Sequence, residues 1–209
     1  MRLFTRTVQL TGTLADGLAI STEIRAFVSA KSGVEIGLWL SQFGAPVGTV
    51  VYAAAIDGLA QLHSIDEALV ADPAYHALLA RGAEYVTTPP VDGLSTPLHG
   101  DLGDPPPVGS AALVTTAVVA GGKYAEAMAW GVDMAVHSEN VTGYPVGFHM
   151  DDFGTFGSVA WVSAAPDLAA IDVAADKLNA DSSYLEKLGA VGDLFVPASG
   201  HRSMAIRIA

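Results

Sequence analysis

Apolar and polar residues alternate along several short segments of the chain, and longer segments between them carry apolar residues at helical spacing. Alternation predicts strands, because successive side chains point to opposite faces of a sheet. Strands are predicted at 2–10, 34–43, 49–56, 111–120, 144–153, 158–165 and 203–209, and helices at 13–33, 60–82, 123–140 and 167–189. The second of these helices is expected to break at Asp72-Pro73, because proline removes a helical hydrogen bond.

The two halves of the chain repeat the same spacing of glycine and aromatic residues. A shift of 110 residues superposes Gly12 on Gly122, Gly33 on Gly143, Gly37 on Gly147, Phe43 on Phe153 and Gly44 on Gly154. Past one turn, a shift of 109 superposes Gly48 on Gly157, Tyr52 on Trp161 and Tyr75 on Tyr184. A single gap placed in a turn is typical of a true duplication, so we interpret the chain as one fold written twice.

Each copy has the element order β-α-β-β-α-β, which is the ferredoxin-like order. The first copy's closing strand is expected within 93–100, and the proline- and glycine-rich segment 87–110 separates the copies. We therefore expect a first repeat at 1–100, a linker at 101–109 and a second repeat at 110–209. Strands such as 49–56 are apolar on both faces, so the face that a repeat's own helices leave bare needs a cover.

In this order and duplication the chain resembles the dimeric α/β-barrel superfamily, which includes the antibiotic-biosynthesis-monooxygenase-like proteins. The resemblance implies an α+β fold in which two tandem ferredoxin-like (βαββαβ) units pack sheet to sheet as an intramolecular dimeric α/β barrel. It also implies a class of activity, namely a cofactor-independent monooxygenase or isomerase acting on a small apolar or aromatic compound. No family-specific catalytic motif accompanies it, so the resemblance is one of architecture.

Period-two alternation divides each strand into two sets of side chains. The set with aromatic and polar members suits the space between the sheets, and the small residues Val51, Ala53 and Ala160 are expected beneath helices. The residues expected to line that space are Trp39, Tyr52, His149, Asp151, Trp161 and Arg207. An aromatic lining with a few polar groups is the usual form of a small-molecule site, although the same residues could simply fill a core.

His149 is the candidate catalytic residue, because a neutral imidazole in a closed pocket can act as a general base. Trp39, Tyr52 and Trp161 would hold a substrate, Asp151 shares the face of His149, and Arg207 or Tyr52 would stabilise an oxyanion. A histidine satisfied inside a core is the competing interpretation. No metal site is expected, since a third ligand beside His149 and Asp151 is missing.

Composition restricts the remaining alternatives. The formal net charge of −12 disfavours nucleic acid and anionic membranes as partners, and the absence of cysteine excludes disulfides and a thiol nucleophile. Without a signal peptide or a long apolar run, the expected location is cytoplasmic. The partner expected is a small-molecule ligand, and the chain is a pseudo-dimer whose further homodimerisation is left open.

Two other functions compete with the enzyme. The first is a non-catalytic ligand carrier or structural module. The second follows from the resemblance, because tandem ferredoxin-like barrels do bind haem, with His149 as the obvious axial candidate. No cofactor is otherwise expected, and a visible absorption spectrum with a Soret band would distinguish the haem protein.

Overall fold

Eight antiparallel strands close into one barrel in the computed structural model, which describes residues 1–103 and 105–209. The strands are β1 Arg2–Gln9, β2 Ile36–Phe43, β3 Thr49–Ile56, β4 Val91–His99, β5 Ala111–Val118, β6 Val146–Asp151, β7 Ser158–Ala165 and β8 His201–Arg207. The helices are α1 Leu14–Ser32, α2 Leu59–Val70, α3 Pro73–Gly82, α4 Tyr124–Thr142, α5 Leu168–Ala180 and α6 Ser182–Gly189, with a 3-10 turn, η1, at Ala83–Tyr85. Around the barrel the order is β1-β3-β2-β8-β5-β7-β6-β4.

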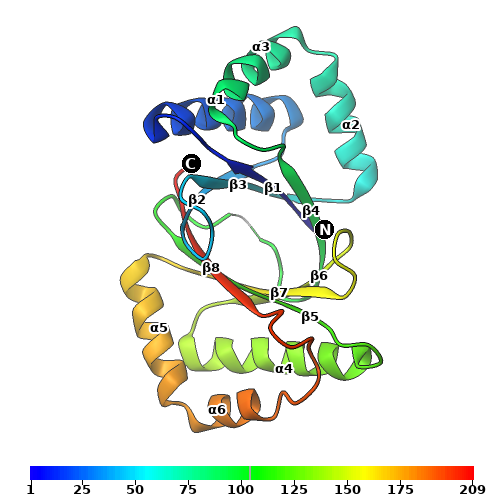
Figure 1. The fold of residues 1–209 in the computed structure, drawn as a ribbon, viewed down its shortest axis with the longest axis vertical. Coiled ribbons are helices and arrows are strands. Elements are labelled where there is room, and N and C mark those ends of the chain that lie inside the picture. The colour runs from blue at the N-terminus through cyan, green and yellow to red at the C-terminus, as the bar shows by residue number, and fades with distance from the viewer. Residues whose placement is uncertain (104) are drawn as a thin grey trace.

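The barrel consists of two four-stranded sheets, one from each repeat. The first repeat contributes β4-β1-β3-β2 and the second contributes β8-β5-β7-β6. Two seams join them, because β4 pairs with β6 and β2 pairs with β8. Figure 1 shows α1 to α3 covering the outside of one sheet and α4 to α6 covering the opposite side. The predicted fold is therefore confirmed: two tandem ferredoxin-like units form an intramolecular dimeric α/β barrel.

The helix ends repeat between the two units. Helices α1 and α4 both stop at a glycine in the left-handed conformation, Gly33 with φ 71° and Gly143 with φ 82°. Glycine adopts this conformation without the steric cost that a Cβ brings, which explains the repeated residue. The break predicted at Asp72-Pro73 is present, since the Asp72 side chain caps α3 by accepting from the Ala74 amide. No helix of the described residues combines the length and apolarity that a membrane crossing requires.

The helix-facing side of each sheet forms the hydrophobic core. In the first repeat Val8, Leu38 and Val50 pack together, and in the second Phe148 and Val159 do the same under α4. These positions are excluded from water by the helices, as expected for a layered α+β fold.

Two of the expected barrel-lining residues lie on this helix-facing side instead. The Tyr52 hydroxyl donates to the Ser21 carbonyl of α1 at 3.3 Å, and Trp161 Nε1 donates to the Gly131 carbonyl of α4 at 2.9 Å. The predicted orientation of β3 and β7 was therefore wrong, and Val51, Ala53 and Ala160 occupy the barrel-facing positions. Both faces of these strands are apolar, so alternation could not identify the inner one; a buried aromatic polar group also needs a partner, which the helix backbone supplies.

Candidate functional site

A cavity of about 460 Å³ lies between the first repeat's sheet and helices α1 to α3. Most of its lining is aliphatic or aromatic, and it includes Phe4, Val8, Ile20, Ile24, Leu62 and Val86. Polar side chains also line it, among them Arg6, Ser21, Tyr52 and Asp66. An apolar cavity of this size with a few polar groups has the form of a small-molecule site.

Arg6 brings the cavity a cation that is held in one orientation. Its Nε and Nη2 donate to the two carboxylate oxygens of Asp92, each at 2.7 Å. The guanidinium carbon lies 5.8 Å from the centre of the Phe4 ring, another lining residue. The hydrogen bond to Asp92 raises the pKa of Arg6 above its ordinary value, against the opposing effect of burial. Arg6 Nη1 has no hydrogen-bond partner among the described residues, so it is available to a ligand.

Tyr52 lies directly opposite Arg6 on the neighbouring strand. Burial raises the pKa of its phenol, so the hydroxyl stays protonated at neutral pH. The hydroxyl donates a hydrogen bond to the Ser21 carbonyl, and the phenol oxygen can still accept a hydrogen bond from another group. Arg6 and Tyr52 together give one donor and one acceptor at the sheet side of a largely apolar cavity.

Three aromatic residues occupy the equivalent region of the second repeat. The repeat relates Ile20, Tyr52 and Val86 to Trp130, Trp161 and Phe195, and the matching bridges Leu10–Val86 and Val119–Phe195 support that alignment. The three rings meet edge to face, with centroids 5.5 Å apart for Trp130–Phe195 and 5.8 Å for the other two pairs.

This cluster leaves the second repeat a cavity of about 210 Å³, less than half the volume found in the first. The two copies share one backbone plan but differ in the volume that their side chains leave free. The first repeat is therefore the one with room for a sizeable ligand.

His149 lies on the barrel-facing side of β6 and is only 3% exposed. Its Nδ1 is 3.4 Å from the Ser95 hydroxyl across the β4–β6 seam. The imidazole covers Gly147, where an added Cβ would lie 2.5 Å from Nε2, and Trp39 covers Gly37 in the same way in the first repeat. Tyr52 and Trp161 were expected near His149 but lie on the other face of the sheets. The role of His149 as a general base stays a prediction.

Asp151 shares the barrel-facing side with His149, two residues further along β6. Burial raises the pKa of its carboxyl group, opposed by a hydrogen bond from Ser158. Neither Asp151 nor His149 lines the cavities of about 460 and 210 Å³. Their assignment to substrate binding and catalysis is untested by this arrangement.

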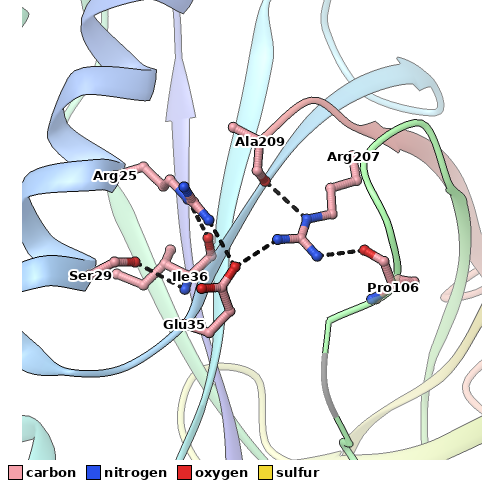
Figure 2. A network of polar contacts seen from close by, with 7 residues as sticks. All are labelled: Arg25, Ser29, Glu35, Ile36, Pro106, Arg207 and Ala209. Atoms are coloured by element: carbon pink, nitrogen blue, oxygen red, sulfur yellow. Dashed lines mark hydrogen bonds and ion pairs between the residues drawn. The ribbon is translucent and has the colours of Figure 1, made fainter.

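Arg207 is 7% exposed and is fully engaged in a polar network at the β2–β8 seam (Figure 2). Its Nε donates to the Ala209 carbonyl at 3.0 Å, its Nη1 to the Pro106 carbonyl, and its Nη2 to Glu35 at 2.9 Å. Glu35 also accepts from Arg25 Nη2 at 2.8 Å. Each nitrogen of Arg207 thus has a protein partner, and the network holds the segment between the repeats against the barrel.

The lining residues do not fit a haem. Neither cavity is lined by a histidine, and His149 is enclosed on the other face of the sheet. Within residues 1–103 and 105–209, no group of three His, Asp or Glu side chains is placed to hold a metal ion. We derive no chemistry through either group.

Comparison with known proteins finds solved structures with the same architecture. No protein-family model and no curated protein matches the chain. A candidate monooxygenase from Fusobacterium nucleatum has a similar structure, with a TM-score of 0.68 and 10% identity over 100% of this chain and 92% of its own. An anthrone oxidase-like protein gives 0.61 and 14% over 99% and 92%, and a mutant chlorite dismutase from Candidatus Nitrospira defluvii gives 0.53 and 10% over 98% and 91%.

The chain has the dimeric α/β-barrel fold. The resemblance inferred from the duplicated element order is thereby confirmed at the level of the fold. At sequence identities of 10 to 14%, the similarity supports a shared dimeric α/β-barrel fold, but it does not assign the activity of any of these proteins to this chain.

The burial of His149 predicts how the unfolding free energy depends on pH. Desolvation lowers the pKa of the His149 imidazole below its ordinary value in the folded state, so at acid pH the unfolded chain binds the proton more tightly. The contribution of the neutral His149 side chain to stability is complete above the ordinary imidazole pKa of about 6.5. It is lost as the pH falls through the lower pKa of the folded state. We expect His149→Gln to flatten the dependence of the unfolding free energy on pH between 7 and 5, measured by urea denaturation. An unchanged slope would contradict the buried, neutral imidazole.

Proposed function

We propose that the protein binds a small, largely apolar aromatic compound in the cavity of about 460 Å³ and oxidises it as a cofactor-independent monooxygenase. The observation that supports this proposal most is the contrast between the repeats: the first keeps a large cavity with Arg6 and Tyr52, whereas the second fills the same region with three aromatic rings. The reaction class comes from the similarity in fold to the candidate monooxygenase and the anthrone oxidase-like protein.

An anthrone illustrates the chemistry. It carries a ketone opposite a methylene group, and oxidation by O2 converts the methylene to a second ketone and releases one water. Loss of a methylene proton moves negative charge onto the ketone oxygen, giving an enolate. Arg6 Nη1 would donate to that oxygen, Tyr52 would orient the ring system, and Asp66 is the lining carboxylate that would take the proton. The aliphatic lining would exclude water from the carbanionic substrate.

Oxygen uptake with anthrone as the probe tests this proposal. We expect the wild-type protein to consume O2 and form anthraquinone faster than the uncatalysed autoxidation. Arg6→Met should lower kcat/KM by about 100-fold, because it removes a donor to the developing oxyanion. Formation of anthraquinone is followed by absorbance and O2 consumption by an oxygen electrode.

Arg81→Met is the matched control, since Arg81 pairs with Glu23 outside the cavity. It should leave the rate unchanged. Equal rates for Arg6→Met and wild type would remove Arg6 from the reaction, and a wild-type rate no greater than the autoxidation would remove anthrone oxidation itself.

A non-catalytic carrier is the second candidate function. The observation in its favour is that Asp66 is the only carboxylate, and no histidine appears, among the cavity-lining residues described. A carrier would bind the same apolar compounds without consuming O2. Binding without oxygen uptake would therefore assign the protein to this class.

A further inference from the structure

The smaller cavity, in the second repeat, has a composition of its own. It measures about 210 Å³, and Trp130, Trp161, Leu113 and Met134 give it apolar walls. Its volume suits one aromatic ring or a short branched chain, because an apolar cavity of about 150 Å³ can hold benzene. Thr115 and Arg202 also line this cavity, from adjacent strands β5 and β8.

Arg202 is unusual among the cations of this chain. Of the ten Lys and Arg residues, eight form ion pairs with carboxylates of the described residues: Arg2, Arg6, Arg25, Lys31, Arg81, Lys123, Lys187 and Arg207. Lys177 donates to the Thr142 carbonyl, and Arg202 has no carboxylate partner among residues 1–103 and 105–209. In a chain of net charge −12, a cation without an acidic neighbour is a preferred location for an anion.

The geometry of Arg202 leaves its outer nitrogens available. Nε donates to the Thr115 hydroxyl at 3.1 Å, which fixes the plane of the guanidinium. Nη1 and Nη2 have no hydrogen-bond partner among the described residues. Two parallel N–H groups of one guanidinium match the two oxygens of a carboxylate.

The first repeat is different at the matching positions. The strand pairing relates Thr115 to Arg6 and Arg202 to Asp92, because Arg6 lies between Tyr52 and Asp92 just as Thr115 lies between Trp161 and Arg202. The first cavity therefore carries a neutralised Arg–Asp pair where the second carries a single arginine. The two cavities therefore differ in charge as well as in volume.

We propose that the second repeat's cavity is a separate binding site for a small carboxylate with one aromatic ring or a short branched apolar group. The carboxylate lies against Arg202 Nη1 and Nη2, and the apolar part lies in the cavity against the Trp130 and Trp161 side chains that line it. The site is independent of the ligand proposed for the first repeat.

Benzoate is the probe, titrated into the full chain by isothermal calorimetry and by tryptophan fluorescence, which reports on Trp130 and Trp161. We expect one saturable site per chain. Arg202→Met should weaken binding about tenfold or more, because it removes charge-assisted hydrogen bonds to the carboxylate. Thr115→Val, which only frees the guanidinium plane, should weaken it less. Benzamide, the uncharged counterpart of benzoate, should bind as weakly as benzoate does to Arg202→Met.

Lys177→Met is the matched control, because Lys177 also lacks a carboxylate partner among the described residues but does not line the cavity. It should bind benzoate as wild type does. Val86→Phe, which narrows the first cavity, should also leave benzoate affinity unchanged, so a failed benzoate site is distinguishable from a failed ligand site in the first repeat. Absence of saturable binding, equal affinity in Arg202→Met, or loss in Val86→Phe would each overturn the proposal.

Discussion

Transferring two of the second repeat's aromatic residues to the first should abolish ligand binding there. The double variant Ile20→Trp/Val86→Phe places Trp and Phe where Trp130 and Phe195 stand in the other copy. We expect 8-anilinonaphthalene-1-sulfonate, an aromatic probe with one anionic group, to lose at least tenfold in affinity, because the added rings occupy the space that it needs. Fluorescence titration measures the loss, and anthrone oxidation should fall with it.

The same variant should remain folded. Filling an existing cavity with apolar atoms commonly stabilises a protein by about 0.5–2 kcal/mol, so its melting temperature should equal or exceed that of wild type. Val173→Phe is the control, since Val173 is exposed on α5 and lines neither cavity. It should bind the probe normally. Undiminished probe binding in a folded double variant would show that the first cavity is not the site.

Separating the two repeats should prevent either from behaving as a stable monomer. Residues 1–100 alone would lose the β4–β6 and β2–β8 pairings, leaving two strand edges and the barrel-facing side of the sheet in contact with water. Unpaired edges associate with other strands, and an exposed apolar face adds to this tendency. We expect the fragment to aggregate or to form a self-dimer, as measured by size-exclusion chromatography with light scattering.

Residues 108–209 are the comparison, because that fragment loses the same two seams from the other side. It should behave in the same way, and mixing the two fragments should restore a complex of one copy each. A monomeric first fragment with cooperative unfolding would contradict the dependence of each sheet on the other.

Most of the fold could be predicted from the duplication in the sequence. Paired positions such as Gly33 and Gly143 recur because both copies need a left-handed residue after the first helix, and that requirement is visible in the letters alone. The element order then gave the ferredoxin-like unit, and the double-sided apolarity of strands such as 49–56 indicated that two sheets face each other.

The same double-sided apolarity made the inner face of two strands unpredictable. Tyr52 and Trp161 look suited to a barrel interior, but their polar atoms find helix carbonyls on the outer side. On β2 and β6 the prediction of the inner face was correct, because the alternate residues that include Trp39 and His149 are mixed aromatic and polar, and on β2 the opposite set is aliphatic. In the structure Trp39 covers Gly37 and His149 covers Gly147 on that inner face.

Arg6 was the main residue missed as a site candidate. A signal was present, because Arg6 stands at the centre of a strand on the same face as Phe4 and Val8, where an unsatisfied cation would be costly. Its partner Asp92 is 86 positions away in the sequence, and only the closed sheet brings the two together. The volume of the second repeat's cavity could not be predicted from the sequence either, since it depends on how three aromatic rings from α4, β7 and the segment before β8 meet.

A crystal structure of the protein with 8-anilinonaphthalene-1-sulfonate bound tests the central claim most directly. The account predicts density for the probe between the β4-β1-β3-β2 sheet and α1 to α3, with its sulfonate near Arg6 Nη1 and its rings beside Tyr52. Density for the probe inside the barrel beside His149 and Ser95, with the first cavity empty, would contradict it.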